Sequence, residues 1–248
     1  MDLPEPNLQQ ESPGSQLFGD SYFYQRILIG YVGWALALTV IAYSLIVSGF
    51  NFESSVSAYY YTGIGDFYVG CLFAIGLFLC TYTGPDGKDI VFGVVAGVSA
   101  IFVALLPIDM QLSDGTQIDN GFIGVLHWVA ATTLFAMFGL ISTFVFTKHN
   151  VGRRTFASPL SNIPEDPERK KLHFRYIYCG IFIFACMFLI LLFKVILKVP
   201  EFVPGLTPTF LFEELALIAF AYSWSLKAGA LRHLLAMKQK RSLTGTEE

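Results

Sequence analysis

The segment FRYIYCGIFIFACMFLILLFKVIL, residues 174–197, decides the fold of this chain. It contains 24 residues, of which only Arg175 and Lys194 are charged. A helix rises about 1.5 Å per residue, so about 20 apolar residues cross the ~30 Å hydrocarbon core of a membrane. The segment is therefore predicted to be a membrane-spanning helix.

The composition extends this interpretation to the whole chain. Of its 248 residues, 54% are hydrophobic and 16% aromatic, and only 14% are charged. Typical globular domains carry about 25% charged residues. This balance excludes a disordered chain and an ordinary soluble core. The net charge of −3 supplies no basic field, so nucleic acid is not expected as a partner.

Six such segments follow one another along the chain, each about 19 to 25 residues long. They are Ile27–Phe50, Ile64–Tyr82, Ile90–Ile108, Phe122–Phe146, Phe174–Leu197 and Thr209–Arg232. Backbone groups in a bilayer must pair internally, and short connections favour antiparallel neighbours. The sequence predicts an all-α polytopic membrane protein with six transmembrane helices in an antiparallel bundle. The expected parts are a polar N-terminal tail (1–26), the six-helix domain (27–232) and a C-terminal tail (233–248).

The placement of Lys and Arg predicts the orientation of these spans. Basic residues concentrate in residues 148–175 and in the C-terminal tail after Arg232. The loops after the first, third and fifth spans instead hold acids: Glu53, Asp109, Asp114, Asp119 and Glu201. By the positive-inside rule, both termini are expected to be cytoplasmic. Lys227, near the end of the last span, is expected to extend to the cytoplasmic interface.

Ionisable and hydroxyl side chains gather near the exoplasmic ends of the predicted spans. The residues predicted to bind a ligand are Ser57, Tyr60, Asp66, Asp109, His127, Glu213 and Glu214. Ionisable groups at membrane depth are costly, so they are the default functional candidates. Mutual pairing would recover part of the lost solvation of Asp66, His127 and Glu214, which lie on separate spans. We expect these three to converge in the outer third of the bundle, covered by Ser57 or one of Tyr59–Tyr61.

Each of these side chains also has a purely structural interpretation. Asp66 could cap the second span, and Glu213 or Glu214 could sit favourably at the positive end of the last span. A single histidine inside a membrane is more often a hydrogen-bonded packing residue than a ligand. The sequence alone leaves both interpretations open.

Two stretches carry a resemblance to a known group. They are SVSAYYYT (55–62) with GDFYVG (65–70) and AIGLFL (74–79), and FEELALIAFAYSWSLK (212–227). The chain resembles a family of uncharacterised bacterial six-span membrane proteins over most of its second to sixth spans. The resemblance implies a six-span fold in a bacterial inner (cytoplasmic) membrane, and it supplies no activity.

A remoter similarity is to membrane hydrolases of the alkaline-ceramidase and progestin-receptor-like type. These place a serine, an aspartate and three histidines around zinc, and Ser57 followed by Asp66 is loosely similar to that arrangement. The chain departs from the pattern because His127 is its only histidine inside a predicted span. A catalytic zinc wants three protein ligands, which Asp66, His127 and Glu214 could in principle supply.

Three function classes fit these observations. The favoured one is a protein whose exoplasmic polar site binds a membrane lipid or small ligand, or which serves as an accessory subunit of a protein complex. The first alternative is a metal-dependent membrane hydrolase acting on a lipid, and the second is a proton-coupled transporter. Whether the protein is an enzyme stays open, its cofactor is unknown and no metal ligand is identified.

The predicted orientation can be tested by cysteine accessibility labelling from the two sides of the membrane. Single cysteines at positions 53, 114 and 201 are expected to react from the exoplasmic side, and those at positions 153, 170 and 238 from the cytoplasmic side. Labelling of positions 114 and 153 from the same side would contradict the predicted topology.

Overall fold

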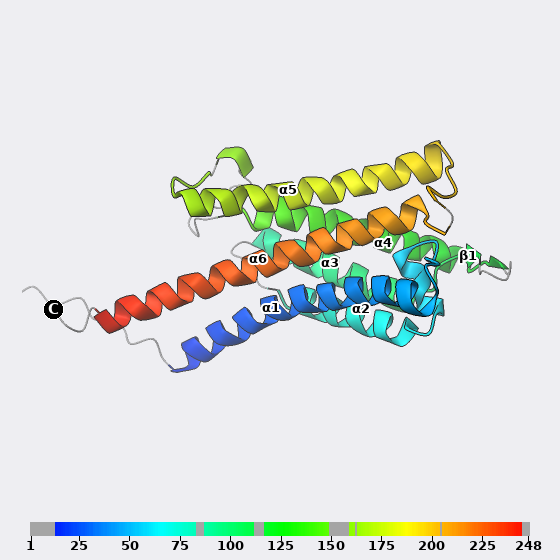
Figure 1. The fold of residues 1–248 in the computed structure, drawn as a ribbon. Helices are drawn as coiled ribbons and strands as arrows, with labels where there is room; N and C mark the ends of the chain where they lie inside the picture. The colour runs from blue at the N-terminus through cyan, green and yellow to red at the C-terminus, as the bar shows by residue number, and fades with distance from the viewer. Residues whose placement is uncertain are drawn as a thin grey trace, which may run out of the picture.

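The computed structural model describes residues 13–82, 87–111, 117–148, 159–161, 163–203 and 205–244, and nearly all of them are helical (Figure 1). The α-helices are α1 (Pro13–Ala42), α2 (Gly65–Cys80), α3 (Gly87–Leu105), α4 (Phe122–Leu140), α5 (Pro167–Ile190) and α6 (Pro208–Thr244). Three of them continue as π-helical turns: η1 (Tyr43–Val47), η3 (Ile141–Val145) and η5 (Leu191–Ile196). The 3-10 helices η2 (Val56–Tyr61) and η4 (Pro159–Ser161) and a short antiparallel hairpin, β1 (Met110–Gln111) with β2 (Gln117–Ile118), complete the described elements. The predicted all-α class is confirmed.

Five helical segments of the described chain are long and apolar enough to cross a membrane. They are Tyr24–Val47, Gly87–Leu105, Phe122–Val145, Pro167–Ile196 and Pro208–Gly229. The second predicted span is shorter in the structure, because α2 contains 16 residues and so extends about 24 Å at 1.5 Å per residue. The apolar helices are those of a multi-pass integral membrane protein.

The first and last helices extend past the predicted limits of the membrane domain. Helix α1 begins at Pro13 and α6 continues to Thr244, whereas the predicted domain runs from 27 to 232. The domain limits stay a prediction, since helix length alone does not locate the membrane surface. Asp114 and Arg153, used above to predict the orientation, lie outside the described residues.

The six α-helices form a closed ring. Each helix packs against the next one along the chain, and α1 also packs against α6. Aromatic side chains fill the interior: Phe138 stacks on Phe220 with ring centroids 3.6 Å apart. The Trp224 ring meets those of Tyr82 and Phe146 edge-on. This ring leaves the outer helix faces apolar and available to lipid.

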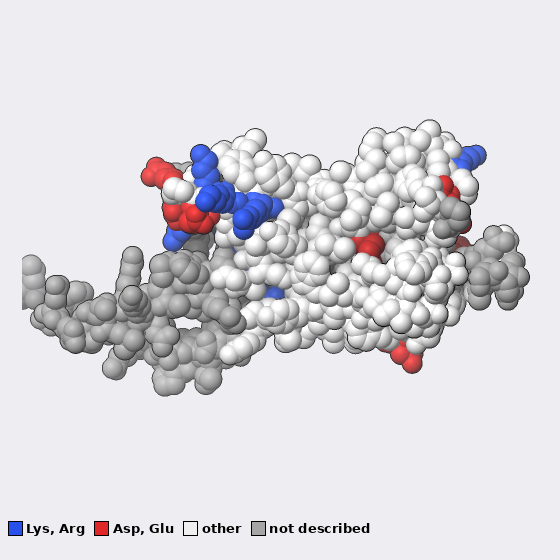
Figure 2. All heavy atoms as spheres, viewed as in Figure 1, with Lys and Arg blue, Asp and Glu red and all other residues white. Residues whose placement is uncertain are grey.

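The two ends of the ring differ. The start of α1, the start of α5 and the end of α6 lie at one end, which we call the terminal end (Figure 1). Segment η2, the β1–β2 hairpin and the 197–207 turn lie at the other, which we call the hairpin end. Figure 2 shows charged side chains mostly at these ends, with a largely uncharged band between them on the face in view, interrupted by an acidic patch. Such a band matches the hydrocarbon core of a bilayer.

Helices α2 and α3 approach each other closely at two glycines. A Cβ atom added to Gly97 would lie 2.6 Å from the Gly76 carbonyl oxygen and 2.5 Å from the Cys80 Sγ atom. A Cβ atom added to Gly76 would lie 2.8 Å from the Gly97 carbonyl oxygen. Small residues allow backbones in a membrane to meet in this way.

Replacing Gly97 with alanine is therefore expected to destabilise the bundle by about 1–3 kcal/mol, because two helix backbones must move apart. The matched control is Gly70→Ala in α2, where an added Cβ meets nothing within 4 Å. Thermal unfolding in detergent should show a lower melting temperature for Gly97→Ala alone. Equal melting temperatures for the two variants would contradict the close approach.

Candidate functional site

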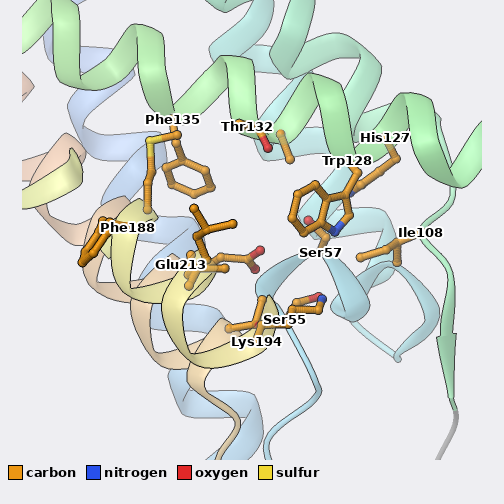
Figure 3. Close-up of a pocket in the computed structure, with 15 residues that line it drawn as sticks. Ser55, Ser57, Ile108, His127, Trp128, Thr132, Phe135, Phe188, Lys194 and Glu213 are labelled. Carbon is orange, nitrogen blue, oxygen red and sulfur yellow. The ribbon is translucent and has the colours of Figure 1, made fainter. Parts of the chain in front are cut away.

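A cavity of about 280 Å³ lies at the hairpin end, between α4, the α5–η5 helix, the start of α6 and the segment before η2. Figure 3 shows how its lining divides into a polar and an apolar part. The polar part consists of Ser55, Ser57, His127, Thr132, Lys194, Thr209 and Glu213. The apolar part includes Phe135, Met187, Phe188, Ile190 and Leu191. The cavity thus combines hydrogen-bonding groups at one side with a hydrocarbon-like surface at the other.

Glu213 connects the last helix to the segment before α2. Its Oε2 atom accepts a hydrogen bond of 2.8 Å from the Val56 backbone N–H, at the start of η2. Ser55 caps the start of η2, since its hydroxyl oxygen accepts a hydrogen bond of 3.1 Å from the Ala58 N–H. The Thr207 hydroxyl adds a third link by donating to the Ser54 carbonyl at 2.7 Å. These bonds hold residues 54–58 against the first turns of α6, where they wall the cavity.

The residues around η2 are withdrawn from water. Val56, Ser57, Ala58 and Tyr59 are all buried, and the Tyr59 hydroxyl hydrogen-bonds with that of Ser44. Burial raises the pKa of the Tyr59 phenol and also raises the pKa of the Glu53 carboxyl above its ordinary value. The hydroxyl-rich stretch therefore packs into the end of the bundle as structured core.

The His127 side chain lines the cavity and contains a buried ring nitrogen without a partner among the described residues. The side chain is 1% exposed, and its Nδ1 atom lies 2.7 Å from the Leu106 carbonyl oxygen. A carbonyl only accepts hydrogen bonds, so Nδ1 carries the proton and Nε2 of the neutral ring holds a lone pair. Nε2 is buried and has no hydrogen-bond partner among the described residues. This atom can accept a hydrogen bond from a ligand.

Lys194 places a positive charge beside the cavity and was not identified from the sequence. It belongs to η5, and its Nζ atom lies 5.6 Å from the centroid of the Trp128 ring. This is a cation–π distance, and Trp128 is 42% exposed. The Lys194 ammonium also lies within electrostatic range of the Glu213 carboxylate. The sequence feature that could have identified Lys194 is its charge within the apolar segment 174–197, where the other charged residue is Arg175.

The structure brings together three of the predicted site residues, Ser57, His127 and Glu213, around one cavity. Asp66 is instead exposed in the first turn of α2, where an acid favours the helix dipole. Glu214 is buried but does not line the cavity, because successive helical residues point about 100° apart. The cavity therefore does not bring Asp66, His127 and Glu214 together as expected, because of these three only His127 lines it.

The other two predicted residues also lie outside the cavity lining. Asp109 is exposed and accepts the Asn120 N–H at 2.6 Å, and its carboxylate lies directly against Gly124. Tyr60 packs edge-on against Tyr61, with ring centroids 5.0 Å apart. Both residues organise the loops around the site.

No group of three or more His, Cys, Asp and Glu side chains is arranged to hold a metal ion in the part of the chain that the structure describes. The set Asp66, His127 and Glu214, considered above for zinc, does not form such a group.

A second polar cluster lies towards the terminal end. Lys227 donates a hydrogen bond of 3.0 Å to the Phe146 carbonyl, and its Nζ atom lies 5.5 Å from the centroid of the Tyr176 ring. Asp89 forms an ion pair of 2.5 Å with Lys148. The expected extension of Lys227 to the cytoplasmic interface stays a prediction; in the structure its ammonium contacts the Phe146 carbonyl and the rings of Phe146 and Tyr176.

Comparisons with protein-family models, with curated proteins and with solved structures find no match to this chain. The resemblance of residues 55–79 and 212–227 to a bacterial membrane-protein family therefore stays a prediction. The function must be argued from the geometry of the cavity.

The two adjacent glutamates are expected to respond oppositely to replacement by leucine. Glu213→Leu leaves the Val56 N–H without its acceptor, which should cost about 1–3 kcal/mol. Glu214→Leu removes two buried oxygens that have no partner among the described residues, so stability should be unchanged or higher. Chemical or thermal unfolding in detergent compares the two. A stabilising Glu213→Leu would show that the bond to Val56 is not structural.

Proposed function

We propose that this protein binds a membrane lipid or an amphipathic small ligand in the cavity between α4, α5–η5 and α6, alone or as a subunit of a complex. The observation that carries the proposal is the cavity itself, which combines buried polar groups with an apolar wall. Its volume of about 280 Å³ lies near the lower end of the range for ligand pockets, about 300–1,000 Å³. It suits a head group and the first part of a chain rather than a whole lipid.

The proposed setting is a bacterial inner membrane, with six antiparallel spans and both termini in the cytoplasm. Helix α2 is counted as a span in addition to the five long apolar helices. Support for this comes from its packing between α1 and α3 in the ring. Support for the orientation comes from Arg169, Lys170 and Lys171 in the first turns of α5, since the start of α5 lies at the same end as the start of α1 and the end of α6 (Figure 1). In this setting the cavity lies on the exoplasmic side.

The cavity wall formed by α5 faces the expected position of the lipid. In the Pro167–Ile196 segment only 22% of the most apolar 18-residue stretch is buried. The buried share of the corresponding stretch in Pro208–Gly229 is 56%. Phe188 and Leu191 both line the cavity and are 58% and 47% exposed. An acyl chain could lie along these side chains while its polar end entered the cavity from the bilayer.

We favour ligand binding over the hydrolase and the transporter because binding needs only the polar and apolar side chains that line the cavity. A metal-dependent hydrolase needs a bound ion, and a proton-coupled transporter needs polar groups along a path through the bundle. The cavity instead ends in an apolar pocket: a smaller cavity of about 30 Å³ continues from Ser57 and Glu213 towards Phe138 and Leu217 in the core.

Filling the mouth of the cavity is expected to abolish ligand retention. Thr132 lines the cavity and is exposed, so Thr132→Trp should block the mouth without disturbing the core. The matched control is Val129→Trp on the same helix, since Val129 is 58% exposed and lies outside the lining. Native mass spectrometry of gently purified protein measures the bound ligand. We expect wild type and Val129→Trp to retain it, and Thr132→Trp to lose it.

The proposal fails if the wild-type protein retains no lipid or other amphipathic ligand under these conditions. It also fails if Thr132→Trp retains as much as Val129→Trp.

A further inference from the structure

The cavity separates its charges in a way that selects among lipid head groups. The Lys194 ammonium lies at the exposed mouth, beside the exposed ring of Trp128. The Glu213 and His127 side chains line the same cavity further from solvent, since Glu213 is half-buried and His127 is buried. A complementary ligand therefore carries its negative charge near the mouth and its positive charge inside.

The inner groups are hydrogen-bond acceptors that need a donor. Glu213 receives the Val56 N–H on Oε2, and a carboxylate can accept several hydrogen bonds. His127 offers the lone pair of Nε2, because its Nδ1 is committed to the Leu106 carbonyl. A primary ammonium supplies three N–H donors and a compensating charge. A trimethylammonium group has the charge but no N–H to donate.

The Lys194 ammonium at the mouth needs an anionic partner, which the same ligand must supply. Lys194 has three donors on a flexible stem, and lysine is a common phosphate-binding side chain. In a phospholipid the phosphate lies between the acyl chains and the head-group nitrogen. A chain along Phe188 and Leu191 would therefore bring the phosphate to Lys194 before the ammonium reached the interior.

We infer that the ligand is a zwitterionic glycerophospholipid whose head group ends in a primary ammonium, of the phosphatidylethanolamine class. Its phosphate contacts Lys194, and its ammonium lies between the Glu213 carboxylate and His127 Nε2. This inference rests on the proposed function and adds to it the chemistry of the head group.

The test compares three lipids with identical acyl chains: phosphatidylethanolamine, phosphatidylcholine and phosphatidylglycerol. Purified full-length protein is reconstituted with equal amounts of the three, and bound lipid is quantified by native mass spectrometry. Wild type should prefer phosphatidylethanolamine by about tenfold, as expected for an ammonium–carboxylate hydrogen bond, which neither of the other two head groups can make. Equal binding of the three lipids, or a preference for phosphatidylglycerol, would overturn the inference.

Three variants separate the contributions of the head group. Glu213→Gln keeps an oxygen for the Val56 N–H but loses the charge, so the preference over phosphatidylcholine should disappear. His127→Asn keeps a donor for the Leu106 carbonyl and removes Nε2, so it should weaken phosphatidylethanolamine selectively. Lys194→Gln should weaken phosphatidylethanolamine and phosphatidylcholine alike, because both carry the phosphate. Lys198→Gln is the control, since Lys198 is exposed and outside the cavity lining.

The outcomes distinguish this inference from the proposed function. Retention of lipid without head-group selectivity overturns the inference and leaves the lipid-binding proposal standing. Retention of no lipid of any class overturns both. A selectivity that persists unchanged in Glu213→Gln and in His127→Asn overturns the placement of the ammonium.

Discussion

The hydrogen bond from the Val56 N–H to the Glu213 carboxylate is the interaction on which the polar end of the cavity depends. A backbone N–H buried near lipid without an acceptor is costly, and so is a carboxylate without a donor. Each group therefore compensates the other. The bond fixes η2 against α6, and η2 in turn brings Ser55 and Ser57 to the cavity. The bond acts together with the Thr207–Ser54 hydrogen bond and the burial of Val56 and Ala58 to hold residues 54–58 against the bundle.

The spacing between neighbouring helices of the ring varies with the size of the side chains between them. Helices α2 and α3 meet through Gly76 and Gly97, where no Cβ atom fits. Helices α4 and α5 also come close at one level, where a Cβ atom added to Gly180 would lie 2.7 Å from the Gly139 carbonyl oxygen. Nearer the hairpin end the same two helices carry Trp128, Phe135 and Phe188, which line the cavity. Residue size along the helices thus decides where the bundle closes and where it leaves room for a ligand. The polar groups are placed by the loops at the hairpin end.

Much of the fold could be predicted from the sequence, because membrane-spanning helices depend on local apolar length. The site was only partly predictable. The cost of burying ionisable groups directed attention to His127 and Glu213, which line the cavity. The same argument selected Asp66, which the solvent at the helix start satisfies. Sequence cannot tell which of Glu213 and Glu214 faces a cavity, since that depends on the rotation of α6 against its neighbours. Lys194 was missed because its role comes from Trp128, which lies 66 positions earlier on another helix.

The order of synthesis follows from the 157 positions that separate Val56 from Glu213. At roughly 5–20 residues per second, the ribosome needs about 8 to 30 seconds to make the chain between them. Throughout that time the N–H of Val56 can be satisfied only by water or by a temporary partner, and α1 waits without its neighbour α6. The cavity is therefore completed only when α6 joins the five helices made before it. A nascent chain arrested before α6 would hold the apolar wall and most of the polar residues of the cavity but would lack Thr209 and Glu213. Lipid could therefore reach the unfinished cavity from the side that α6 closes later.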